Sequence, residues 1–215
     1  GEILSTINRL GLDDMTFVMF TTDNGPWLSY GEHGGSAGPL REGKATVWEG
    51  GVRVPCLMRW PGRIPAGKVC DEPLMTIDIL PTIARLIGAK LPKHPIDGKD
   101  AWPLISGAPD AKSPHEAYYL YWGNDLQAVS SGKWKMHFPH TYPSLEGKPG
   151  GKGGKPVPYV QKKTELALFD LESDVGETHD VAAEHPNVVE RLTKMGKASD
   201  EDLKANTRSP GKISA

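Results

Sequence analysis

The chain has 215 residues, of which 24% are charged and 38% hydrophobic, a balance that excludes collagen, coiled-coil and wholly disordered chains. Its formal net charge of -2, from 25 basic and 27 acidic residues, gives no electrostatic reason to expect a nucleic-acid or anionic-membrane partner. No apolar run approaches the roughly 20 residues that a membrane-spanning helix needs, so we expect no membrane span.

The residue pattern of the N-terminal half predicts alternating helices and buried strands. Apolar residues recur with helical spacing over residues 3–10, so the sequence opens inside a helix. A protein seldom begins inside such an element, and we therefore expect a C-terminal part of a longer protein. Short apolar runs predict strands of a mostly parallel sheet within residues 14–22 and 53–60. Helical periodicity returns over residues 75–88.

The pattern changes after about Asp110. Short strand-like runs separated by Gly, Asn, Asp and Pro predict an antiparallel sheet over roughly residues 115–172, followed by a helix over 186–204. Residues 145–158 are rich in Gly, Lys and Pro and are predicted to hold no regular element. These patterns indicate an α/β domain over residues 1–110 and a small antiparallel domain with a terminal helix over residues 111–215.

Asp23 and Asn24 follow the first predicted strand directly. Ligands of open α/β sheets bind beyond the carboxyl ends of strands. A carboxylate and an amide oxygen are hard ligands that suit Ca²⁺ or Mg²⁺. The two residues therefore form a candidate metal site, although Asp-Asn-Gly-Pro is also an ordinary turn sequence.

Lys44 and three histidines are further candidates for a site. Lys44 follows a glycine, and its ammonium could enter a pocket and pair with an anionic oxygen, although most lysines are solvated. His33, His137 and His140 could contact a substrate as acids, bases or hydrogen-bond donors, or could be packing and surface residues.

Seven short motifs occur in one order along the chain: Phe20–Pro26, Gly38–Lys44, Trp48–Pro55, Arg59–Gly62, Asp78–Thr82, Asp97–Asp100 and Leu168–Glu177. Together they resemble the C-terminal half of type I sulfatases, the arylsulfatase A-like group of the alkaline phosphatase superfamily. The resemblance implies a parallel-sheet catalytic domain followed by a small antiparallel sheet with a C-terminal helix. It implies that Asp23 and Asn24 ligate an active-site Ca²⁺ and that Lys44 contacts the sulfate. His137 matches a position whose role varies in the family.

The resemblance also implies what this sequence lacks. The family nucleophile is a formylglycine made from the first residue of a Cys/Ser-x-Pro-x-Arg motif, and neither Cys56 nor Cys70 begins such a motif. We therefore expect the nucleophile and the remaining metal ligands in a missing N-terminal half. This chain alone is then inactive and exposes apolar surface where that half docks. The implied reaction is hydrolysis of aryl or carbohydrate sulfate esters, with substrate choice set by loops 27–43 and 138–160.

Two alternatives remain open at the level of sequence. One is a phosphodiesterase or phosphonate hydrolase of the same superfamily. Two-zinc members usually carry Asp-His where this chain has Asp23 and Asn24, because imidazole suits Zn²⁺, and Asn24 argues against them. The other alternative is a non-catalytic binding module. The absence of glycosylation sequons and the presence of only two cysteines favour a bacterial periplasmic or secreted protein over a lysosomal one.

Overall fold

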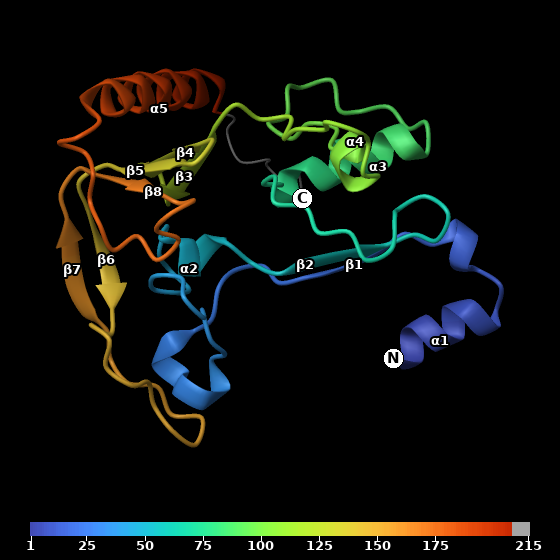
Figure 1. The fold of residues 1–215 in the computed structure, drawn as a ribbon, viewed down its shortest axis with the longest axis horizontal. Coiled ribbons are helices and arrows are strands. Elements are labelled where there is room, and N and C mark those ends of the chain that lie inside the picture. The colour runs from blue at the N-terminus through green and yellow to red at the C-terminus, as the bar shows by residue number, and fades with distance from the viewer. Residues whose placement is uncertain (208–215) are drawn as a thin grey trace, which may run out of the picture. The chain divides into compact units, whose positions relative to one another are not determined.

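The computed structural model describes residues 1–207 (Figure 1). The chain divides into two compact units. The first unit combines residues 1–22 with residues 55–116, and the second combines residues 23–54 with the chain from Ala117 on. The domain boundary after residue 110 stays a prediction. Within residues 1–207, no helix combines the length and the apolar character needed to cross a membrane.

The first unit contains a two-stranded sheet and five helical segments. Strand β1 pairs with β2 from Val18 opposite Arg59 to Thr21 opposite Cys56. The strands and helices predicted for this half are confirmed, with shorter bounds. The elements of this unit are α1 (Glu2–Arg9), η1 (Asp13–Met15), β1 (Val18–Thr21), β2 (Cys56–Arg59), η3 (Thr76–Asp78), α3 (Ile79–Leu86) and α4 (Trp102–Ile105).

The pairing of β1 with β2 is antiparallel, whereas a mostly parallel sheet was predicted for the two strands. Parallel neighbours need a crossover connection, usually a helix of several turns that packs on the sheet. The chain between β1 and β2 holds only two short helical pieces, η2 (Leu28–His33) and α2 (Glu49–Val52). All strand pairs within residues 1–207 are antiparallel.

A buried carboxylate organises the helical part of the first unit. Asp78 is fully buried, and its carboxylate accepts hydrogen bonds from the backbone N–H groups of Met75 (3.1 Å) and Lys99 (2.8 Å). The ring of His115 lies 2.6 Å from the same carboxylate. Because a buried charge is costly unless it is paired, these partners fix the start of α3 against the segments near Lys99 and His115.

The first unit also exposes large apolar side chains, as predicted. Phe20 of β1 and Leu57 of β2 are paired residues in adjacent strands, and they are 68% and 61% exposed. Further exposed apolar residues lie on helices α1 and α3: Ile3, Leu4, Leu80 and Ile83. Exposed apolar side chains that lie side by side, as Phe20 and Leu57 do, are typical of faces that contact another protein segment.

The second unit contains a four-stranded antiparallel sheet in the order β3-β4-β5-β8 and a separate two-stranded ribbon of β6 and β7. The predicted antiparallel sheet and C-terminal helix are confirmed, and no regular element falls between Ser144 and Val160, also as predicted. Sequence patterns did not reveal β6 and β7. The bounds are β3 (Tyr118–Trp122), β4 (Asp125–Ser131), β5 (Trp134–His137), β6 (His140–Ser144), β7 (Val160–Thr164), β8 (Ala167–Asp170) and α5 (Pro186–Asn206).

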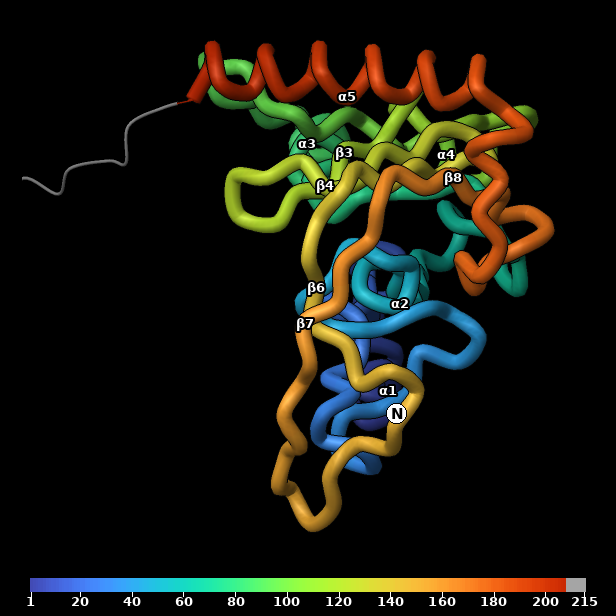
Figure 2. Tube along the Cα trace, turned by 90° about the vertical axis from the view of Figure 1, so that its left-hand side faces the viewer, coloured from blue at the N-terminus to red at the C-terminus, as the bar shows by residue number. Residues whose placement is uncertain are grey.

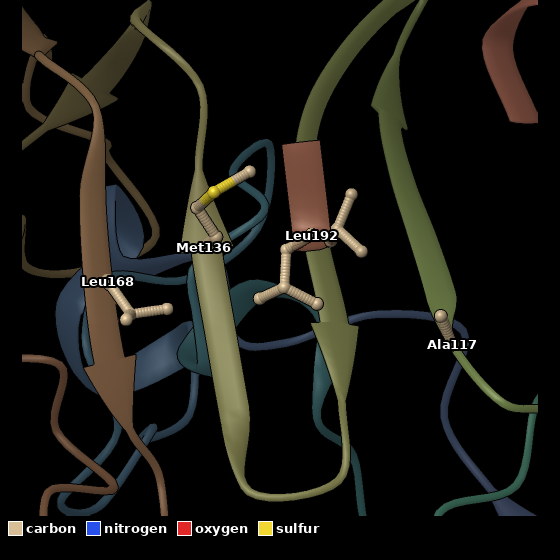
Figure 3. Close-up of a cluster of buried hydrophobic side chains, with 5 residues drawn as sticks. Ala117, Met136, Leu168 and Leu192 are labelled. Atoms are coloured by element: carbon tan, nitrogen blue, oxygen red, sulfur yellow. The ribbon is translucent and has the colours of Figure 1, made fainter. Parts of the chain in front are cut away.

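Helix α5 covers one face of the four-stranded sheet, and the main core of the second unit lies beneath it (Figure 2). Met136 of β5, Leu168 of β8 and Leu192 of α5 belong to one cluster of buried apolar side chains (Figure 3). The fully buried members are Val129, Met136, Leu168 and Leu192.

Leu192→Ala should lower the free energy of unfolding by about 2–5 kcal/mol, because it removes buried methyl groups and leaves a cavity. Leu203→Ala on the same helix is the matched control, since Leu203 is 43% exposed and should change stability by less than about 0.5 kcal/mol. Urea unfolding followed by circular dichroism measures both. Equal effects of the two substitutions would contradict this description of the core.

Candidate functional site

Two of the predicted site residues meet directly. The Lys44 ammonium donates a hydrogen bond to Oδ1 of Asn24 at 3.1 Å, and both side chains are half-buried. Asn24 and its exposed neighbour Asp23 lie just beyond the end of β1, where the polar cluster was predicted. The Lys44 ammonium is therefore held beside the amide oxygen of Asn24, and a positioned cation of this kind suits an anionic group.

Glycines make the close backbone packing around this pair possible. The N–H of Gly25 donates to the carbonyl of Gly51 at 3.0 Å, and a Cβ atom on Gly25 would come within 1.7 Å of the carbonyl oxygen of Gly50. Only glycine fits at such a distance. The N–H of Lys44 donates to the carbonyl of Pro26 at 2.9 Å, so both sides of the loop are held beside Asn24.

A buried cluster of charged side chains lies behind this loop. Glu177 is fully buried, and one of its carboxylate oxygens accepts the backbone N–H of Glu49, the first residue of α2, at 2.6 Å. The other oxygen is 2.9 Å from Nε2 of His137 and 3.2 Å from Nζ of Lys135. Lys135 also donates to the Glu49 carboxylate at 2.8 Å. The cluster therefore joins α2 to strand β5.

The charge states of this cluster follow from its burial. Burial lowers the pKa of His137 to about 4, against the opposing effect of the hydrogen bond to Glu177, so the ring is neutral at pH 7. Burial by itself raises the pKa of Glu177, but the His137 hydrogen bond and the Lys135 charge outweigh it and lower the pKa below its usual value. An ionised Glu177 accepts, so Nε2 of the neutral His137 carries the proton and donates.

Trp48 packs at the centre of the same region. It is fully buried, the Arg41 guanidinium lies 3.6 Å from its ring centroid, and the His137 ring is stacked at 3.9 Å. Arg41 also donates to the backbone carbonyl of Glu177 at 2.7 Å. A cation over a desolvated indole is stabilising, so Arg41 ties the loop that precedes Lys44 both to Trp48 and to the C-terminal segment at Glu177.

The other predicted residues lie in different surroundings. His33 is exposed, and its ring is 3.7 Å from the Glu32 carboxylate. His140 donates from Nδ1 to the carbonyl of Phe138 at 2.7 Å, and burial lowers its pKa. His137 and His140 are stacked on each other with ring centroids 5.6 Å apart and are buried within this chain. Contact of these three histidines with a substrate stays a prediction.

The sequence analysis did not identify Glu177, Lys135 and Trp48 as structural partners of the Lys44 loop. Glu49 and Lys135 are 86 residues apart, and Glu49 and Glu177 are 128 apart, so no local spacing could reveal these contacts. The available signal was a charged residue inside a short strand, because Lys135 lies between the apolar residues Trp134 and Met136 and needs a partner if it is buried.

The two loops expected to set substrate choice are joined by backbone hydrogen bonds. The carbonyl of Ser29 accepts from the N–H groups of Gly151 (2.8 Å) and Val157 (3.0 Å), and the N–H of Ser29 donates to the Tyr159 hydroxyl at 3.1 Å. A cavity of about 440 Å³ lies between the loops, lined by Leu28, Gly31, Arg41, Glu42, Leu145 and Lys148 among others.

The described residues hold no ready-made cluster of metal-ligand side chains. Among residues 1–207, no three His, Cys, Asp or Glu side chains come close enough together to hold a metal ion. This chain therefore offers two oxygen ligands, those of Asp23 and Asn24, to the candidate metal site. Cys56 and Cys70 are both exposed free thiols.

Comparison with known proteins identifies the family. The sulfatase family model matches residues 1–89, and the model of the C-terminal region of aryl-sulfatase matches residues 113–214. The chain belongs to the sulfatase family. Membership implies a metal ion and a formylglycine nucleophile in general terms.

The similar proteins include steryl-sulfatase of Rattus norvegicus, 36% identical over 100% of this chain and 40% of that protein. Arylsulfatase A of Bos taurus is 38% identical over 84% of this chain and 36% of that protein. The crystal structure of a sulfatase from Pseudoalteromonas sp. has a TM-score of 0.82 at 28% identity, covering 98% of this chain and 42% of that one. This likeness confirms the predicted sulfatase fold, and the chain spans about two fifths of the sulfatases that it matches.

Glu177→Ala should lower the free energy of unfolding by about 3–5 kcal/mol, because it leaves the buried Lys135 ammonium without one of its two counter-charges. Glu172→Ala is the control, since Glu172 is exposed and belongs to the same segment. Denaturant unfolding of both variants is the measurement. A loss of less than about 1 kcal/mol for Glu177→Ala would contradict the role given to the cluster.

Lowering the pH from about 6.5 to 4 should destabilise the protein through His137. Its pKa is about 4 when folded and near 6.5 when unfolded, so the unfolded chain binds the proton more readily over this interval. The contribution lost is on the order of 3 kcal/mol. His137→Gln should give a shallower dependence of unfolding free energy on pH. Parallel profiles for the two proteins would show that His137 does not carry this effect.

Proposed function

We propose that this chain supplies one side of the active site of a sulfatase that hydrolyses aryl or carbohydrate sulfate esters. The observation that carries the proposal is the hydrogen bond between Lys44 and Asn24 at the end of β1, beside Asp23. It places a point charge beside the amide oxygen of Asn24, and Asp23, the preceding residue in the chain, carries a second hard oxygen ligand. A transferred sulfuryl group needs both kinds of partner, because it carries negative charge on several oxygens at once.

Asp23 and Asn24 are the residues that would hold the metal ion, and their donor set fits Ca²⁺. One carboxylate and one amide oxygen are hard ligands, and the Asn24 oxygen has a second lone pair besides the one that accepts from Lys44. Ca²⁺ takes 6–8 oxygen ligands, so other segments must complete the shell. When bound, the ion supplies positive charge that polarises the sulfate group.

Lys44 has the clearest role among the residues of this chain. Its ammonium is anchored on Asn24 and its backbone on Pro26, so the charge is positioned before substrate arrives. A positioned cation stabilises the negative charge that develops on a sulfate or leaving-group oxygen, and no reorganisation is needed at the moment of reaction. The Glu49–Glu177 contact fixes α2 behind this loop and thereby limits its movement.

The nucleophile is proposed to lie outside this sequence. The 215 residues contain no Cys/Ser-x-Pro-x-Arg motif, and the relatives are more than twice as long as the stretch matched here. We propose that the remaining part of the protein provides the formylglycine and the other metal ligands and contacts the exposed apolar face that includes Phe20 and Leu57. On this proposal the isolated chain binds sulfate esters poorly and does not turn them over.

A phosphodiesterase or phosphonate hydrolase is the second candidate within the superfamily. The donor set disfavours a two-zinc site of that kind, because Asn24 offers an amide oxygen where imidazole would suit Zn²⁺. Activity of the complete protein toward a phosphate diester in place of a sulfate ester would favour this candidate.

Lys44→Ala should lower kcat for an aryl sulfate by about 10²–10³ in the complete protein carrying the modified nucleophile, because one preorganised cation is lost. Lys44→Arg should not restore activity, since a planar guanidinium cannot occupy the place of a compact ammonium. The assay follows release of 4-nitrophenol from 4-nitrophenyl sulfate.

Lys68→Ala is the control for this measurement, because Lys68 is exposed and its ammonium donates to the carbonyl of Gly107 at 3.3 Å. It should leave kcat within about twofold of the wild type. A Lys44→Ala variant that keeps more than half of wild-type turnover would remove Lys44 from the site.

A further inference from the structure

An exposed tryptophan lies beside the Lys44 ammonium. Trp27 is 47% exposed although it is among the largest apolar side chains in the second unit. Nζ of Lys44 lies 5.6 Å from the centroid of its ring. The same ammonium donates to Asn24, so Trp27, Lys44 and Asn24 line one small region of surface.

The position of Trp27 is fixed by its backbone. Its N–H donates to the carbonyl of Gly34 at 3.1 Å, and its own carbonyl accepts from Tyr30 at 3.0 Å. A Cβ atom on Gly34 would come within 2.0 Å of that carbonyl oxygen, so the loop closes tightly over it. The residue before it, Pro26, has no N–H and a restricted φ, which stiffens the approach.

The indole ring is also supported from one side. The Tyr30 ring meets it edge-on with centroids 4.7 Å apart and planes at 70°. Edge-to-face pairs of this kind are favourable and hold the ring in one orientation. An aromatic side chain that is rigid, supported by another ring and still half exposed is suited to stack on a flat ligand.

We infer that Trp27 is the platform on which the ring of the substrate stacks while its sulfate group meets Lys44. This inference rests on the proposed sulfatase function and deepens it by assigning a residue, Trp27, to the ring that carries the sulfate ester, whether that ring is aromatic or a pyranose. Both kinds of ring offer a flat face to an indole, by π-stacking or through C–H groups. An inorganic sulfate ion reaches Lys44 without touching this platform.

The experiment uses the complete protein with its modified nucleophile and compares wild type, Trp27→Ala and Trp27→Phe. Trp27→Ala should lower kcat/KM about tenfold or more on a ring-borne sulfate ester, and Trp27→Phe should stay within about threefold of wild type. Inorganic sulfate, measured as a competitive inhibitor, should keep its Ki within about twofold in both variants. The two substrate arms are 4-nitrophenyl sulfate and a methyl pyranoside sulfate, and the arm with the larger loss identifies the kind of ring.

Trp122→Ala is the matched control, because Trp122 is 55% exposed and lies at the end of β3. It should leave kcat/KM and the Ki of sulfate unchanged.

An unchanged kcat/KM for Trp27→Ala would overturn the inference while leaving the sulfatase function intact. Equal weakening of ester and inorganic sulfate would overturn it as well, because Trp27 would then act only through Lys44. Absence of sulfatase activity in the wild type would overturn the proposed function and this inference together.

Discussion

The carboxylate of Glu177 is the point on which the site-bearing unit depends. It is fully buried and ionised, and it receives a backbone N–H of α2, the ring N–H of His137 and the ammonium of Lys135. Removing water from a carboxylate is costly, so these partners must be in place at the same time. The result is that α2, strand β5 and the segment after β8 have one mutual arrangement.

This arrangement separates residues that hold the fold from residues that face a ligand. Glu177, Lys135 and His137 are buried and satisfy one another, whereas Lys44 and Trp27 keep part of their surface accessible. Arg41 belongs to the first group, because its guanidinium covers Trp48 and contacts the Glu177 backbone. Rigid support behind a loop allows the exposed groups on that loop to be positioned without their own charges being neutralised.

The sequence predicted the elements that have a strong period or a clear strand end. The helix at residues 186–204, the strands of the antiparallel sheet and the polar turn at Asp23 and Asn24 all follow from local patterns. The antiparallel pairing of β1 with β2 did not, because the direction of pairing depends on the path of the connection. Strands β6 and β7 were not predicted either. Pro143 and the run Gln161–Lys163 are residue types common in loops, and the two segments become strands only because they pair with each other.

Family resemblance implied that Asn24 ligates Ca²⁺ and that Lys44 contacts the sulfate, but neither their direct hydrogen bond nor the charge cluster was predicted. Polar contacts between segments that are distant in sequence leave no periodic signal, because each residue taken alone resembles a solvated one.

The hydrogen bond from Glu49 to Glu177 has a consequence for the order of folding. Its partners are separated by 128 residues, so the support behind the Lys44 loop is among the last contacts that a growing chain can make. Contacts of such long range form slowly, since a large loop must close before they stabilise anything. During synthesis, the segment that carries Asn24 and Lys44 therefore lacks the Glu49–Glu177 contact until residue 177 has left the ribosome.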